Sequence, residues 1–181
     1  TMERQVREAK GAGIDAFSLN WLGSGNPTDT NLQTLLSVAG SAGFLVTVDV
    51  DLDSPFIRNT GDVVNSLNYL KRYLADRAWL RYDGKPVVVF YGIRKYEVDT
   101  WAIMRSMVDP DRAALWIGEG DVFSYLSVFD GIHPYSIAWA ANPAGQLAGY
   151  AAKTRAVPGK LWVATVMPGY THVQHAQPVT L

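Results

Sequence analysis

The chain has no cysteine among its 181 residues. This excludes disulfide bonds, thiolate zinc sites and a cysteine nucleophile. It also has no apolar run near the roughly 20 residues that a membrane-spanning helix needs. An excess of charge of one sign is also missing. The 16 Lys and Arg nearly balance the 17 Asp and Glu, the formal net charge is -1, and no basic stripe is present. We therefore expect neither a nucleic acid nor an anionic membrane as a partner.

Signatures of phosphate and serine chemistry are absent as well. The segment GSGNP at 23–27 begins like a dinucleotide-binding loop, but it lacks the third glycine and its proline makes it a turn. No G-x-x-x-x-G-K-[ST] loop and no G-x-S-x-G nucleophile elbow occurs. His172 and His175 stand three apart without an evident third metal ligand. No metal and no organic cofactor is expected.

Six short apolar runs dominate what is present. They read GIDAFSLNW (13–21), GFLVTVDVD (43–51), KPVVVFYG (85–92), AALWIGEGD (113–121), FDGIHPYS (129–136) and KLWVATVMPGY (160–170). Runs this apolar are typical of strands that are buried on both faces, as in a parallel sheet covered by helices. We expect all of these strands to be parallel, with right-handed crossovers.

The segments between the runs change to a helical period. Helices are predicted over 1–12, 29–42, 60–76, 96–107 and 143–156, with room for only a short one at 121–128. For the second helix, Asp29 or Thr30 is the expected N-cap and Gly43 the stop. The α/β alternation fits a single domain over 1–181. Two architectures remain open: an open doubly wound sheet, or a parallel (β/α)8 barrel, which typically needs about 250 residues and eight strands.

Ligand sites in such sheets lie just beyond the carboxyl ends of the strands. The candidate residues there are polar or aromatic: Asn20, Trp21, Asp49, Asp51, Tyr91, Glu119, His133, Tyr135 and Tyr170. Aromatic rings beside carboxylates, repeated from strand to strand, favour a carbohydrate ligand over a phosphate. Among the other tryptophans, Trp79, Trp101 and Trp116 are assigned to the core.

Several candidates also allow a purely structural role. Asp49 and Asp51 lie two apart and share one side of their strand, where carboxylates must be solvated, paired or functional. The alternative is that Asp51 caps the next loop and Asp49 pairs with a neighbouring cation. Glu119 lies between two glycines and either reaches the mouth of the site or, with Asp121, favours a helix N-terminus. His133 either serves a sugar hydroxyl or is a satisfied core histidine.

The strings GIDAFSLNW, DGKPVVVFYG, FDGIHPYS and LWVATVMPGY, in this order, resemble the (β/α)8 glycoside hydrolases related to the endo-α-mannosidases of family 99. The first string, followed by GF-x-x-x-x-D, also resembles the alpha-1,3-glucanases of family 71. The resemblance spans about 11–170. It implies an incomplete barrel, with the runs as its second to seventh strands, and hydrolysis of α-linked glycans of the α-mannan or alpha-1,3-glucan type. The implied partner is an oligo- or polysaccharide.

The resemblance also implies roles for individual residues. In the mannosidase-like family, a polar pair two apart at the end of the third strand lines the site, and Asp49 and Asp51 fall there. Asp51 matches the acidic member and is the candidate catalytic residue. Tyr91, Tyr135 and Tyr170 fall where the family places site-lining aromatics. The family's catalytic carboxylate pair follows the last barrel strand, in a segment that does not occur before Leu181, and the stretch after Tyr170 departs from the family pattern.

An incomplete barrel has two open sheet edges, which are aggregation sites. We therefore expect that the chain is a fragment of a longer protein, that its parent is truncated, or that a partner chain closes the sheet. The compartment is not determined, and a secreted parent protein is compatible with the composition. Two other functions remain open. One is a non-catalytic glycan-binding module or pseudoenzyme on a truncated barrel, and the other is an open α/β nucleotide-type domain.

Overall fold

The computed structural model describes residues 1–135, 137 and 140–166. Its elements are α1 (Met2–Gly11), β1 (Ala16–Trp21), α2 (Pro27–Ala42), β2 (Leu45–Asp51), α3 (Thr60–Leu70), η1 (Lys71–Tyr73), β3 (Arg81–Tyr82), β4 (Lys85–Tyr91), η2 (Ile93–Lys95), α4 (Val98–Val108), β5 (Leu115–Glu119), η3 (Phe123–Ser127), β6 (Gly131–His133), α5 (Pro143–Arg155) and β7 (Leu161–Trp162). Each of the six apolar runs contains a strand, and the predicted helices lie within a few residues of their expected bounds. The predicted alternation is therefore confirmed.

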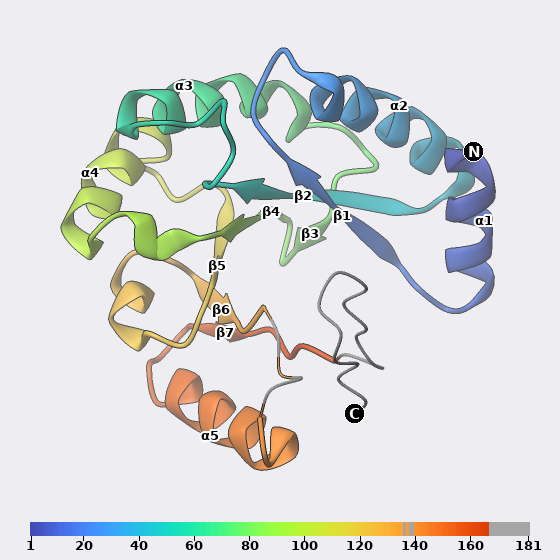
Figure 1. The fold of residues 1–181 in the computed structure, drawn as a ribbon. Helices are drawn as coiled ribbons and strands as arrows, with labels where there is room; N and C mark the ends of the chain where they lie inside the picture. The colour runs from blue at the N-terminus through green and yellow to red at the C-terminus, as the bar shows by residue number, and fades with distance from the viewer. Residues whose placement is uncertain (136, 138–139, 167–181) are drawn as a thin grey trace, which may run out of the picture.

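The main strands form one parallel sheet in the order β1-β2-β4-β5-β6-β7. The sheet bends into an arc, with α2, α3 and α4 along its outer side and α5 beside β7 (Figure 1). Strand β3 corrects the prediction that all strands are parallel, because it pairs antiparallel with the start of β4. The two-residue connection, Asp83 and Gly84, has φ of 48° and 76°, as the tightest hairpin turns require.

Alternate side chains of each strand face different environments. Val46, Val48 and Val50 of β2 are fully buried in the core between the sheet and the helices. The predicted core tryptophans are confirmed there, with Trp79, Trp101 and Trp116 exposed by at most 2%. The intervening residues of the strands face the concave side of the arc, which we call the inner face.

The start of α2 differs from the prediction. The helix begins at Pro27, and its N-cap is Asn26, whose Oδ1 accepts the Thr28 backbone N–H at 2.9 Å. Proline suits this first helical position because it lacks the N–H that would be left unbonded. Asp29 is therefore not the cap. Gly43 ends the helix as predicted, in the left-handed conformation with φ 61°.

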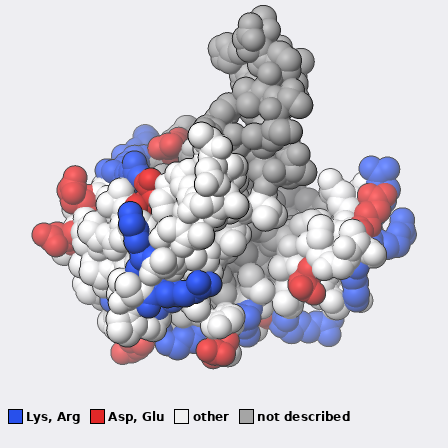
Figure 2. All heavy atoms as spheres, turned by 90° about the horizontal axis from the view of Figure 1, so that it is seen from below, with Lys and Arg blue, Asp and Glu red and all other residues white. Residues whose placement is uncertain are grey.

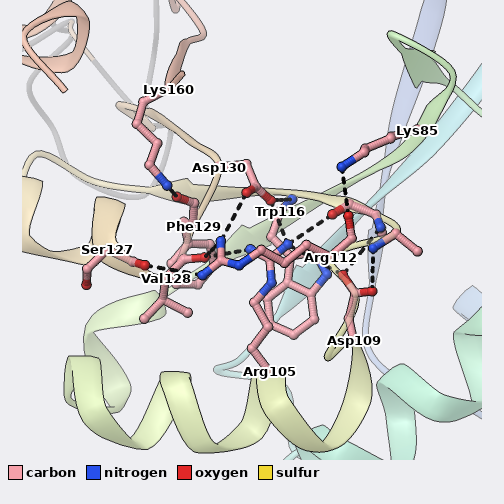
Figure 3. Close-up of polar contacts among 12 residues, drawn as sticks. Lys85, Arg105, Asp109, Arg112, Trp116, Ser127, Val128, Phe129, Asp130 and Lys160 are labelled. Carbon is pink, nitrogen blue, oxygen red and sulfur yellow. Dashed lines mark hydrogen bonds and ion pairs between the residues drawn. The ribbon is translucent and has the colours of Figure 1, made fainter. Parts of the chain in front are cut away.

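A buried ion network joins α4 to β5 and β6 at the amino ends of the strands (Figure 3). The Arg105 guanidinium lies 2.8 Å from Asp130 Oδ2, donates to the Ala114 carbonyl at 3.0 Å and stacks over the Trp116 ring. Arg112 Nη1 lies 3.3 Å from the other Asp130 oxygen. In barrel proteins this end of the sheet serves stability, and ligands bind at the other end.

No helix in the described part of the chain is long and apolar enough to cross a membrane. On the face that Figure 2 shows, Lys and Arg side chains are interspersed with Asp and Glu. That face therefore carries charges of both signs.

Candidate functional site

The carboxyl ends of the strands bring acidic and polar side chains to one edge of the sheet. In the strand register, Asn20 lies beside Asp49 and Asp51 lies beside Tyr91. Glu119 lies beside His133 in the same way. Because these residues alternate with the buried outer-core residues, they share the inner face.

Asp51 is held by two hydrogen bonds. Its Oδ2 accepts from the Asn20 side-chain amide at 3.3 Å, and its Oδ1 accepts the Asp53 backbone N–H at 2.9 Å. The second bond is the loop-capping contact that we weighed as an alternative. A carboxylate has about four lone-pair sites, so capping leaves room for a ligand.

Asp49 lies deeper on the same face. Among the described residues it has no cationic partner, which contradicts the pairing weighed for it, and its Oδ1 is buried without a hydrogen-bond partner. Burial, together with the negative charges of Asp51 and Glu119, raises the pKa of Asp49 to about 6. A carboxyl group with such a pKa exchanges its proton in the pH range in which acid–base catalysts work.

Glu119 ends β5 and is half-buried. Burial raises the pKa of Glu119, and a hydrogen bond from the Gly92 backbone and the Arg94 charge partly oppose this. Gly120 has φ +128°, so the chain turns sharply straight after the carboxylate, as the flanking glycines predicted. The alternative, a negative charge at a helix N-terminus, is not seen for Glu119, because the first turn of η3 contains no acidic residue.

A cavity of about 520 Å³ lies at these strand ends. Tyr91, Glu119 and Tyr135 line it. The two tyrosine rings meet edge to face, with centroids 5.1 Å apart, and Tyr135 is 59% exposed. Exposed tyrosine faces offer both apolar area and a hydroxyl, which is what a sugar ring can use.

His133 lies with Asp49 on the wall of a second, inner-face cavity of about 530 Å³. Its Nδ1 is 3.2 Å from the Pro134 carbonyl, and its Nε2 is buried without a partner among the described residues. Burial lowers the pKa of His133, so the neutral ring is favoured. It is therefore not a fully satisfied core histidine. In the described part of the chain, no group of three or more Asp, Glu or His is arranged to hold a metal ion.

The structure corrects the prediction for Trp21. This residue follows Asn20 directly, so the two side chains point to opposite faces of β1. Trp21 is fully buried on the helix side, stacks on Tyr69, and donates its indole N–H to Asp29 at 3.3 Å. It cannot line the site. Tyr170, His172 and His175 lie outside the described residues.

The sequence analysis missed several cavity residues. Arg94 follows β4, and Gln146 and Tyr150 lie one helical turn apart on α5, and all three line the cavity at the strand ends. The spacing of the α5 pair places both on one helix face. That pattern alone does not distinguish a face that borders a cavity from one that faces solvent.

The curved parallel sheet with helices outside it is part of a (β/α)8 barrel, as predicted. The chain matches two structures of the GH99 endo-alpha-mannosidase from Bacteroides thetaiotaomicron, with TM-scores of 0.79 and 0.76 at 21% and 23% identity. The alignments cover 93% of this chain and 56% and 53% of those chains, so it spans about half the length of these solved structures. The alternative of an open nucleotide-type sheet is thereby excluded.

The model of Glycosyl hydrolase family 71 matches residues 1–180. The chain belongs to this family. The resemblance noted from its apolar strings is confirmed. No curated protein sequence matches the chain.

Proposed function

We propose that the protein hydrolyses α-linked glycans of the α-mannan or alpha-1,3-glucan type, with the sugar bound at the carboxyl ends of the strands. The observation that carries this is the group of three carboxylates, Asp49, Asp51 and Glu119, gathered beside the Tyr91 and Tyr135 rings in a family 71 chain. Carboxylates supply the proton transfers of glycoside hydrolysis, and aromatic rings bind sugar faces.

In this proposal Asp51 is the residue nearest the chemistry. Its two hydrogen bonds, from Asn20 and from the Asp53 backbone, hold the carboxylate in one orientation from which it can orient a hydroxyl or a nucleophile. The contacts to the sugar come from Asn20, Asp49, Tyr91, Glu119, His133 and Tyr135, and Tyr170 remains a prediction outside the described residues. The proposal invokes no metal or organic cofactor.

The principal acid–base pair is not assigned to Asp51 and Glu119. Such a pair needs a carboxyl separation of roughly 5–5.5 Å for retention, or about 6.5–9.5 Å for inversion. We expect this pair in a segment after the last barrel strand, and this location remains a prediction. Closure of the sheet by further strands or by a partner chain also remains a prediction. Among the described residues, β1 and β7 each pair on one side only.

The test uses the protein that contains this chain, with α-1,3-linked gluco-oligosaccharides and α-linked manno-oligosaccharides as substrates. Release of new reducing ends from either series is the expected result. Binding of the oligosaccharides without such release would replace hydrolysis by the second function, a non-catalytic glycan-binding module. Absence of both binding and release would overturn the assignment to α-glycans.

A further inference from the structure

The cavity at the strand ends has a second wall away from the strand residues. It is formed by Arg94 after β4, Asp121 after β5, and Gln146 and Tyr150 of α5. These residues come from three segments that are far apart in the sequence. None of them belongs to the set that the strand pattern assigned to the site.

Hydrogen bonds connect this wall into one string centred on Asp121. The Arg94 guanidinium forms an ion pair with Oδ1 of Asp121, and the Tyr150 hydroxyl donates to Oδ2 at 3.2 Å. The Gln146 side-chain amide in turn donates to the Tyr150 hydroxyl. Behind the string, the Tyr150 ring packs between Phe123 and Trp162, with centroid distances of 6.0 and 6.2 Å. The polar groups are thus held in fixed directions along the cavity.

These hydrogen bonds contribute little to the stability of the fold. The side chains of Arg94 and Asp121 are 57% and 44% exposed. An ion pair with this much exposure to water adds little to the free energy of unfolding. The groups of the string do retain bonding capacity toward the cavity. The Asp121 carboxylate has about four lone-pair sites for its two partners, the guanidinium has five N–H donors, and the Gln146 amide has a carbonyl oxygen besides its donating nitrogen.

We propose that this wall binds a second sugar unit of the same glycan, next to the unit at Tyr91, Tyr135 and Glu119. The inference rests on the proposed function and extends it to recognition of at least two consecutive units. Sugar hydroxyls both donate and accept, which matches the mixed donors and acceptors of the string. Because Arg94 and Asp121 neutralise each other, the wall suits an uncharged glycan. The cavity volume of about 520 Å³ falls in the range of sites that enclose a small ligand.

Tyr150→Phe tests the proposal most sharply, because it removes one hydroxyl and keeps the ring between Phe123 and Trp162. The probes are methyl α-glucoside and methyl α-mannoside and the corresponding α-linked oligosaccharides of increasing length, with affinities from ligand-observed NMR titrations. We expect the variant to bind the oligosaccharides about fivefold more weakly, as for one lost neutral hydrogen bond, and to bind the methyl glycosides unchanged. Gln146→Ala, on the exposed side of α5, should show the same dependence on length. The control is Gln33→Ala on the exposed face of α2. This residue lines neither cavity, and the variant should bind every probe like the unmodified protein.

The outcomes separate this inference from the proposed function. If the unmodified protein binds the oligosaccharides but Tyr150→Phe and Gln146→Ala leave the gain in affinity with length intact, the second sugar unit is wrong and the proposed function stands. If the unmodified protein binds neither series, the proposed function itself fails. An equal loss for methyl glycosides and oligosaccharides also contradicts the proposal, since it would place Tyr150 at the first unit.

Discussion

The Asn20 side-chain amide donates a hydrogen bond to Oδ2 of Asp51 across the β1–β2 pair, at 3.3 Å. With the Asp53 backbone N–H on Oδ1, it fixes the carboxylate from both sides. One of these donors belongs to a neighbouring strand, and sites supported by strands are more rigid than sites on loops. Asp51 is therefore the carboxylate of the site with the best-defined orientation.

Asp51→Asn keeps the shape of this side chain and removes its ability to carry a negative charge or a proton. If Asp51 takes part in proton transfer, hydrolysis of α-linked oligosaccharides should fall at least ~100-fold. The measurement is kcat/KM from release of reducing ends by the protein that contains this chain. Asp111→Asn, in the exposed turn before β5, is the matched control and should keep full activity. Near-normal turnover of Asp51→Asn would remove Asp51 from the chemistry.

Asp49 should make stability depend on pH. Its pKa of about 6 lies above the ordinary value of 3.8, so the folded protein holds the proton more tightly than the unfolded chain does. The associated stability is complete below about pH 4 and is lost as the pH rises through 6, by about 3 kcal/mol in total. Asp49→Asn lacks this loss. Urea unfolding of both proteins at pH 4 and pH 7.5 should show the variant gaining relative to the unmodified protein by about that amount. A difference that does not change with pH would contradict the burial of this carboxyl group.

Arg105 should be a major contributor to stability. Arg105→Met leaves Asp109 buried without a cation and leaves Asp130 with only the more exposed Arg112. Breaking a buried pair in this way costs about 3–5 kcal/mol. The free energy of unfolding from chemical denaturation measures it. The control is Arg4→Ala, which breaks the Arg4–Glu8 pair, also four residues apart in a helix but 64% exposed on both sides. Its loss should stay below about 0.5 kcal/mol. Equal losses for the two variants would contradict the burial of the Arg105 ion pairs.

Gly131 should be intolerant of any side chain. A Cβ atom there would lie 2.7 Å from both the Leu161 carbonyl oxygen and Ile117 Cδ1, so β7 would have to move away from β6. Overpacking of this kind costs about 1–3 kcal/mol, and we expect Gly131→Ala to lose that much by thermal or chemical unfolding. Gly149→Ala is the opposite case, because nothing lies within 4 Å of its Cβ position in α5, and helix propensity should stabilise it by up to about 1 kcal/mol. A neutral Gly131→Ala would mean that the β6–β7 contact is looser than described.

Elements with a periodic residue pattern could be predicted from the sequence, and features without such a pattern could not. The valine-rich β2 and the leucines of α2 repeat at the periods of strand and helix, so these elements could be predicted from local pattern. Strand β3 is only two residues long and leaves no period, so it is not among the six predicted strands. The prediction for Trp21 rests only on its position at the end of a strand. Consecutive strand residues point to opposite faces, so Trp21 is buried on the face opposite to Asn20.

The sequence by itself determined the α/β alternation, the family and the strand-end residues, because each of these follows from short-range pattern and residue type. The tertiary structure decided which of those residues meet. It placed Asp49, Asp51 and Glu119 on the inner face and buried Trp21 in the core. It also brought Gln146 and Tyr150 of α5 close to Asp121. Such contacts join segments separated by tens of residues, and only the curvature of the sheet and the packing of the helices outside it bring these segments together.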